Sequence, residues 1–114
     1  MELPRDAVLL RIFIGENDLY QGEPLFKVIV MRAREQHLAG ATVFRGPMGF
    51  GKSSHLDHNA ILRLSFDSPI VIEMVDTEEK IQSFLPTIES IIGPGLVTLE
   101  RVKAIFFKGK NGQA

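Results

Sequence analysis

The sequence contains no cysteine. This absence excludes a disulfide framework, a thiolate nucleophile and a cysteine-based zinc site. It also fits a reducing compartment, where disulfides do not persist. The first six residues include acidic side chains and a proline in place of the basic start and apolar core of a secretory signal. We therefore expect a cytoplasmic protein.

Long apolar runs and an excess of charge of one sign are missing as well. Apolar runs such as residues 7–10 are far shorter than the roughly 20 residues that a membrane-spanning helix needs. The 13 basic and 14 acidic side chains are intermixed and leave a formal net charge of -1, so there is no overall positive field of the kind that nucleic-acid binders use. We predict neither a membrane span nor a nucleic-acid partner.

The composition is that of a soluble globular protein. The 114 residues are 45% hydrophobic, and we expect a single domain over 1–114 in which 108–114 form a disordered tail. A monomer of this size buries only about two-thirds of the surface of its unfolded chain. Since disulfides are excluded, association into an oligomer is the expected source of further stability.

Hydrophobic spacing predicts an alternation of strands and helices. Strands are predicted at 7–15, 41–45, 69–75 and 96–107, and helices at 24–38 and 77–92. Residues 52–67 are predicted to form a long loop. The order βαββαβ predicts an α+β fold, a ferredoxin-like sandwich with a long loop between strands two and three. Two helices cover one face of such a sheet, so the other face, with Val71 and Val75, is expected to lie against a neighbouring subunit.

Two residues bear on the second predicted helix. Asp76 stands three residues before Glu79, a spacing that resembles a capping box and predicts a helix start. Pro86 lies inside the apolar stripe and removes a helical hydrogen bond, which predicts a kink or a new start at that point.

The segment from Gly46 to Ser53 matches the P-loop pattern G-x-x-x-x-G-K-[ST]. A P-loop joins a parallel strand to a helix within a larger nucleotide-binding sheet. Only about 60 residues follow Lys52, too few for the remaining crossovers at roughly 30 residues each. The motif therefore does not predict a P-loop NTPase, although its glycines permit close backbone approach to an anion and Lys52 supplies a positive charge.

Three segments in order resemble those of a known family. Residues 40–43 (GATV) followed by 49–52 (GFGK) resemble the entry to the T-loop of PII proteins, with Lys52 in place of an arginine. Residues 69–75 (PIVIEMV) resemble the third strand, and 92–97 (IGPGLV) resemble the nucleotide loop. The chain thus resembles the PII-like signalling proteins, in a divergent and largely uncharacterised branch.

This resemblance implies a homotrimer that binds an adenine nucleotide, ADP or ATP, in clefts between subunits. It implies that the first loop faces the phosphates, that the second offers backbone amides, that Thr42 lies near the base or ribose and that Glu73 lines the cleft. The expected nucleotide-binding residues are Thr42, Arg45, Gly49, Gly51, Lys52, Ser53, Glu73, Gly93 and Gly95. Arg45 is included because it adjoins the loop, and the alternative is a solvated arginine at the end of a strand.

The chain also departs from the family pattern. Pro94 and Leu96 stand where the family has an aspartate and a phosphate-binding lysine, so one charge and one backbone donor are missing. Tyr20 is the only tyrosine and does not match the modified T-loop tyrosine. The resemblance therefore predicts adenine nucleotide binding without a preference for ATP, and without control by uridylylation.

We expect a regulatory protein, not an enzyme, whose partner is a membrane transporter or a metabolic enzyme. The alternative is a small phosphoryl-transfer or nucleotide-hydrolysing enzyme that uses Lys52 and nearby histidines. A third possibility is a ligand-free trimeric interaction module or a metal-tolerance protein of a related fold. His55 and His58 lack an evident third ligand, so no metal site and no catalytic residue is predicted.

Overall fold

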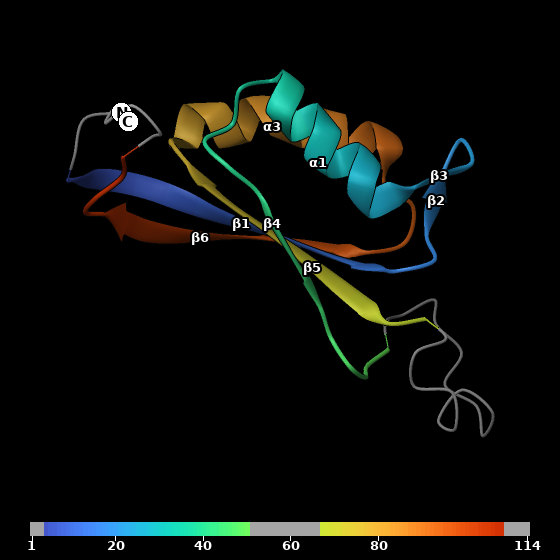
Figure 1. Ribbon diagram of the computed structural model, residues 1–114. Coiled ribbons are helices and arrows are strands. Elements are labelled where there is room, and N and C mark those ends of the chain that lie inside the picture. Colours follow the sequence, from blue (N-terminus) through green and yellow to red (C-terminus); the bar gives the residue numbers. More distant parts are fainter. Residues whose placement is uncertain (1–3, 51–66, 109–114) are drawn as a thin grey trace.

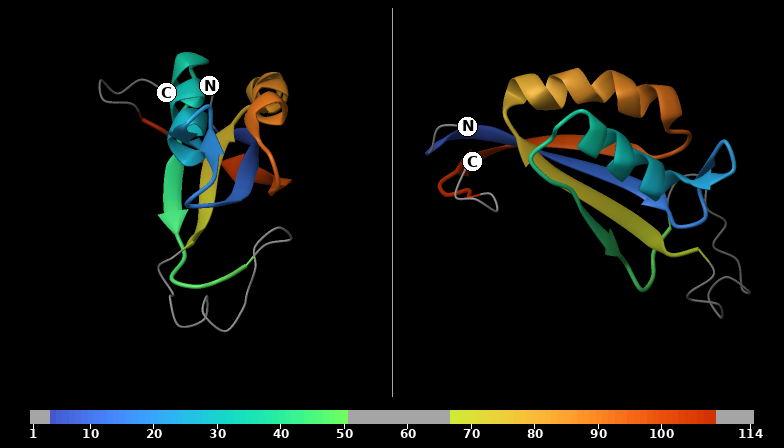
Figure 2. Two further views of the ribbon diagram at one scale, coloured as in Figure 1. Left: turned by 90° about the vertical axis from the view of Figure 1, so that its right-hand side faces the viewer. Right: turned by 45° about the horizontal axis from the view of Figure 1, so that its top comes forward.

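The computed structural model describes residues 4–50 and 67–108. This part of the chain forms a four-stranded antiparallel sheet in the order β4-β5-β1-β6, with α1 (Leu25–Glu35) and α3 (Glu78–Ile91) on one face (Figure 1). The strands of the sheet are β1 (Arg5–Gly15), β4 (Thr42–Arg45), β5 (Pro69–Asp76) and β6 (Leu96–Ala104). The two further views in Figure 2 place both helices on the same side of the sheet. The predicted α+β ferredoxin-like sandwich is confirmed.

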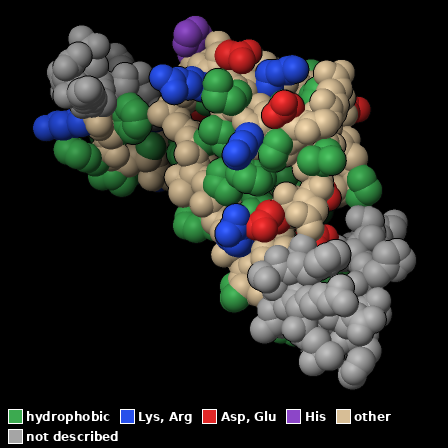
Figure 3. Space-filling view, turned by 45° about the vertical axis from the view of Figure 1, so that its right-hand side comes forward, with side chains coloured by type: hydrophobic (Ala, Val, Ile, Leu, Met, Phe, Trp, Pro, Cys, Tyr) green, Lys and Arg blue, Asp and Glu red, His purple; other side chains and the backbone are tan. Residues whose placement is uncertain are grey.

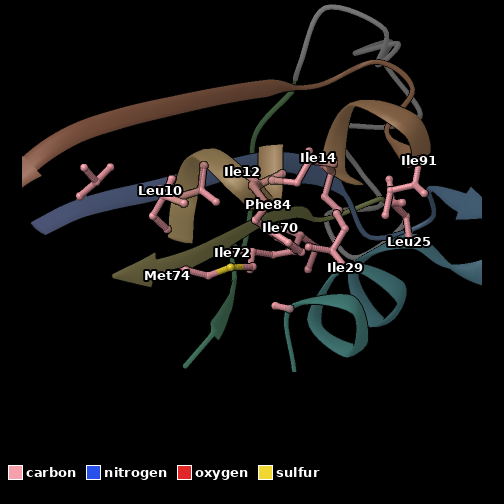
Figure 4. Close-up of a cluster of buried hydrophobic side chains, with 14 residues drawn as sticks. Leu10, Ile12, Ile14, Leu25, Ile29, Ile70, Ile72, Met74, Phe84 and Ile91 are labelled. Atoms are coloured by element: carbon pink, nitrogen blue, oxygen red, sulfur yellow. The ribbon is translucent and has the colours of Figure 1, made fainter. Parts of the chain in front are cut away.

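Alternation along the central strands decides which side chains face the helices. Antiparallel pairing sets Leu10 opposite Met74 and Ile12 opposite Ile72, and directly paired residues point to the same face. These four side chains are at most 2% exposed. The helices add Leu25, Ile29, Ile81, Phe84 and Ile88 from their apolar stripes. In Figure 4, Phe84 lies among Ile12 and Ile70 at the centre of this core.

No element of the described ranges covers the other face of the sheet. This uncovered face carries apolar side chains, half-buried or exposed, from all four strands: Leu9, Phe13, Phe44, Val71, Val75 and Leu96. At its centre Arg11 donates a hydrogen bond to Glu73 (Nε to Oε2, 2.9 Å), and Glu100 Oε2 lies 3.9 Å from Arg11 Nη1. The prediction of an apolar outer face at Val71 and Val75 is confirmed, with the addition of this ion-paired centre.

The hydrogen bond to Glu73 raises the pKa of the Arg11 guanidinium. Burial, the next largest effect, opposes this rise, and the charges of Glu73 and Glu100 add to it. An arginine side chain is already charged at every pH at which proteins fold. Arg11 therefore remains a permanent cation between two carboxylates on the uncovered face.

The first helix and the segment before it differ in detail from the prediction. The helix ends at Glu35, three residues before the predicted end, because His37 adopts a positive φ of 62° that turns the chain. Between β1 and α1 the chain forms a short ribbon, β2 (Leu19–Tyr20) and β3 (Glu23–Pro24), which the sequence analysis missed. Gln21 and Gly22 both have positive φ, as the mirror-image turns of tight hairpins require.

The start of α3 corrects the capping prediction. The helix is capped by Thr77, whose Oγ1 accepts a hydrogen bond from the Lys80 amide at 3.2 Å. Asp76 is buried instead at the end of β5, where its carboxylate accepts the amides of Ala39 (2.8 Å) and Thr77 (2.7 Å). Asp76 thus fixes the connection between α1 and β4 to the start of α3.

Two other boundaries differ from the prediction. The helix α3 runs through Pro86 as one element, so it does not start anew there. The last strand, β6, ends at Ala104, three residues before the predicted end. The residues after 108 and most of the predicted 52–67 loop lie outside the described ranges. Within those ranges no helix is long and apolar enough to cross a membrane.

The Thr77 cap allows a test of stability. Replacement of Thr77 by alanine is expected to lower the free energy of unfolding by about 1 kcal/mol, because the Lys80 amide loses its acceptor. Ser83 also carries a helix hydroxyl, but it bonds back to the Glu79 carbonyl, so Ser83→Ala is the matched control with almost no loss. Urea denaturation of both variants measures the difference, and equal losses would contradict this role of Thr77.

Candidate functional site

The first glycine-rich loop, 46–50, begins where β4 ends and packs on Pro69 at the start of β5. The Gly46 amide donates to the Pro69 carbonyl at 2.8 Å. A Cβ on Gly46 would lie 2.8 Å from Pro69 Cγ, and one on Gly49 would lie 3.1 Å from the same atom. Glycine at both positions is therefore explained by close contact of the loop with the proline ring.

The second glycine-rich loop, 93–95, joins α3 to β6. A Cβ on Gly95 would lie 2.9 Å from the Phe13 carbonyl oxygen and 3.0 Å from Ile92 Cδ1. A Cβ on Gly93 would meet nothing within 4 Å. Gly95 is thus required where the chain passes over the end of β1, while Gly93 leaves an open backbone surface.

The two loops lie at the same end of the sheet but at opposite edges. Gly46 is level with Pro69, which pairs with Gly15, and Leu96 pairs with Phe13 only two residues away along β1. The strands β5 and β1 separate the two edges. Three strand spacings of about 4.8 Å place the loops roughly 14 Å apart. Within one chain the glycines therefore do not form a common cleft.

The charged side chains at this end are mostly acidic. Arg45 Nε lies 2.6 Å from Glu16 Oε2, and Glu16 directly follows β1, between the two loops. Asp18 and Asp67 lie against Gly15, where Asp18 Oδ2 accepts the Gly15 amide at 2.9 Å and Asp67 Oδ1 accepts the Asn17 amide at 3.2 Å. On the face drawn in Figure 3, by contrast, basic and acidic side chains are intermixed.

Thr42 and Glu73 lie away from the loops. They pair with each other across β4 and β5, about 10 Å along the strand from Arg45. Glu73 is held by Arg11 on the uncovered face. Arg101 lies still further away and faces Glu78 at the start of α3, with 3.7 Å between Nη2 and Oε1. The structure thus brings Arg45, Gly46 and Gly49 together and leaves Thr42 and Glu73 near the middle of the sheet.

Several predicted residues cannot be placed in this geometry. Gly51, Lys52 and Ser53, and also His55 and His58, lie outside the described residues. Over residues 4–50 and 67–108, no group of three or more His, Asp or Glu side chains is arranged to hold a metal ion. The strand before the P-loop pattern, β4, is an antiparallel edge strand, and a P-loop requires a parallel one.

The sequence analysis missed Glu16 and Pro69 at this site. Glu16 lay between the predicted strand at 7–15 and the predicted helix at 24–38, and Pro69 was only the first residue of a predicted strand. Both follow or begin a predicted strand, so the signal was their place at a strand end. Assigning them to the site required the strand order, which puts the end of β1 and the start of β5 side by side.

The family follows from comparison with known sequences. A model of the DUF190 family, described as "Uncharacterized ACR, COG1993", matches residues 7–104. The chain belongs to this family. It is 42% identical over 98 residues to a UPF0166 protein of Aquifex aeolicus (strain VF5), covering 86% of this chain and 92% of that protein. A UPF0166 protein of Methanocaldococcus jannaschii is 36% identical over 86 residues, covering 75% and 79%.

Solved structures similar to this DUF190 chain are PII-like. A protein of Thermus thermophilus described as PII-like has a TM-score of 0.61 at 15% identity, covering 88% of this chain and 90% of that chain. CPII of Thiomonas intermedia K12, bound to ADP and bicarbonate, has a TM-score of 0.55 at 16% identity, covering 88% and 89%. The resemblance to PII-like proteins is thereby confirmed as a shared fold.

Proposed function

We propose that this DUF190 protein is a regulatory protein that binds an adenine nucleotide, ADP or ATP, between the subunits of a homotrimer. The observation that carries the proposal is the position of the two glycine-rich loops, at one end of the sheet and on opposite edges. Such loops complete a cleft only when the β4 edge of one copy meets the β6 edge of another. The nucleotide phosphates then lie between loop 46–50 and the partner copy's second loop.

Strand direction supports this assembly. Because each neighbouring pair in the sheet is antiparallel, β4 and β6 run in opposite directions. When the β6 edge of a second copy continues the sheet beyond β4, the start of that β6 lies beside the end of β4. Both glycine loops are then adjacent at every contact. Such a head-to-tail contact uses two different surfaces and closes into a ring when the rotation permits.

The uncovered sheet face supports association as well. Phe44, Val75 and Leu96 are each more than a third exposed on this face. A ring of copies that turns these faces inward buries their apolar surface. This burial stabilises the assembly by about 25 cal/mol for each Å² removed from water. We place the trimer axis on this side of the sheet.

The ligand class is supported by a protein of similar fold. CPII has been solved with ADP and bicarbonate bound, and also with ADP, AMP and bicarbonate. In the present chain the proposed contacts are Arg45, Gly49, Gly93 and Gly95, extended by Gly51, Lys52 and Ser53 outside the described residues. Thr42 and Glu73 reach the nucleotide only if it extends along the sheet toward the middle of β5.

Regulation would act through the first loop. Nucleotide bound at loop 46–50 would change the surface that a partner protein meets, an order–disorder switch. A membrane transporter or a metabolic enzyme is the proposed class of partner. The protein has no catalytic residue in this proposal.

Isothermal titration of the purified protein with ATP, ADP and AMP tests the proposal. Binding is expected for at least one nucleotide, and Lys52→Ala is expected to weaken it about tenfold by removing a charge-assisted contact to phosphate. Lys27→Ala, on the exposed side of α1, is the matched control and leaves binding unchanged. Absence of binding of all three nucleotides at millimolar concentration would refute the proposal.

The same samples distinguish the regulatory protein from the alternative, a small nucleotide-converting enzyme. A regulatory protein returns the nucleotide intact after long incubation, whereas a phosphoryl-transfer or hydrolytic enzyme converts it. Chromatography of the nucleotide pool measures this, and turnover that Lys52→Ala abolishes would favour the enzyme.

A further inference from the structure

We propose that Glu16 balances the positive charge of Arg45 in the nucleotide site, so that Arg45 itself adds no charge-based preference for nucleotides with more phosphate groups. This inference rests on the proposed nucleotide function and assigns a selectivity-determining role to a residue outside the two glycine loops. It concerns which adenine nucleotide the protein senses.

The ion pair places Glu16 at the site. Arg45 ends β4 and directly precedes Gly46, and its Nε lies 2.6 Å from Glu16 Oε2. The backbone of Glu16 is fixed by a hydrogen bond from its amide to the Ser68 carbonyl at 2.8 Å, next to the Pro69 ring on which the glycine loop packs. Glu16 is therefore held beside the loop by its own backbone as well as by its side chain.

Burial makes this pair difficult to separate. The Glu16 side chain is 22% exposed while that of Arg45 is 63% exposed. Glu16 Oε2 itself is buried and accepts no hydrogen bond from the described residues, so Arg45 is the group that meets its charge. A phosphate that drew Arg45 away would leave a buried carboxylate oxygen without a partner, which is costly. The pair is expected to persist when nucleotide is bound.

In a persisting ion pair, Arg45 can still donate hydrogen bonds to a phosphate, but its charge is balanced. Its guanidinium has five N–H donors, and the Nε donor faces Glu16, which leaves the terminal nitrogens to donate hydrogen bonds to a phosphate. The positive charge, however, is cancelled at short range by Glu16. Arg45 thus binds a phosphate through hydrogen bonds, but it does not increase the affinity for each further negative charge on the nucleotide.

The residues around the ion pair also add no positive charge that would favour additional phosphate groups. Asp18 and Asp67 lie at this end of the sheet with their oxygens accepting backbone amides, and no basic side chain stands at the start of β6, where Leu96 is 57% exposed. These groups are unchanged in a Glu16 variant. The effect of Glu16 alone is therefore measurable against a constant background.

The test is a series of affinities for AMP, ADP and ATP, measured by titration calorimetry in buffer with a metal chelator. Compared with wild type, Glu16→Gln is expected to gain a further factor of roughly three in affinity for each phosphate group added from AMP to ATP. This factor is the effect of one unit charge about 8 Å away in a largely aqueous environment. Glu78→Gln removes another ion-paired carboxylate, at the opposite end of the sheet, and is the matched control with no change. Thermal melting without nucleotide checks that each variant is folded.

The outcomes separate this inference from the proposed function. An equal change for all three nucleotides, or a loss of affinity, in Glu16→Gln would overturn the inference while leaving nucleotide binding intact. No binding by the wild-type protein would overturn both. A second measurement needs no Glu16 variant: in Lys52→Ala, which removes the other proposed cation of the site, ATP is expected to bind no more tightly than ADP, and an affinity that rises tenfold with the third phosphate would overturn the inference.

Discussion

Gly95→Ala is expected to lower the free energy of unfolding by about 2 kcal/mol, because an alanine Cβ would stand 2.9 Å from the Phe13 carbonyl oxygen. Backbone is the nearest obstacle, so the loop or the end of β1 must shift to admit the methyl group. For a domain of this size the change corresponds to a melting temperature about 10 °C lower. The displaced loop is also expected to weaken nucleotide binding.

Gly93→Ala is the matched control for this prediction. The two glycines stand in one short loop with Pro94 between them, but a Cβ on Gly93 meets nothing within 4 Å. Its melting temperature is expected to stay within about 2 °C of wild type. Thermal denaturation followed by circular dichroism compares the two variants. A Gly93 variant as unstable as the Gly95 variant would show that steric contact with β1 is not the cause.

The second large effect concerns assembly. Phe44→Glu is expected to convert the trimer into monomers at low micromolar concentration, because Phe44 lies on the uncovered face of the edge strand β4 and is 50% exposed in the single chain. Burying an unpaired carboxylate at a contact between copies costs about 3 kcal/mol or more, which weakens association at least about 100-fold. Size-exclusion chromatography with light scattering measures the change in mass.

Met31→Glu provides the control for a surface charge as such. Met31 is 53% exposed but lies on α1, in the layer on the other side of the sheet. This variant is expected to keep the mass of three chains. A wild-type protein with the mass of one chain would contradict the proposed trimer, and a Phe44 variant that remains a trimer would place the contact elsewhere.

These two variants also separate stability from binding. If the cleft forms between copies, Phe44→Glu should lose nucleotide binding while each chain remains folded, since the substituted side chain is outside the core. Gly95→Ala acts within one chain and is expected to affect stability first. Nucleotide binding by a monomeric Phe44 variant would show that one chain is sufficient for the site.

The succession of elements could be predicted because its signals are local. Alternation at 69–75 places Ile70, Ile72 and Met74 on one face, and the structure buries all three at 2% exposure or less. The capping prediction at Asp76 was wrong although the pattern is present. Instead of capping the helix, Asp76 accepts a hydrogen bond from the Ala39 amide. This partner is 37 residues away, so no short sequence window contains it.

The sequence by itself determined the order of the two helices and the four strands of the main sheet, the two glycine-rich loops and the resemblance to PII-like proteins. These depend on side-chain spacing and residue type over a few positions, which act before the chain is folded. Only the tertiary structure decided that the loops lie on opposite edges of the sheet, that Pro69 packs against the first of them and that Glu16 forms an ion pair with Arg45. Those contacts join residues far apart in sequence, and strand order and register bring them together.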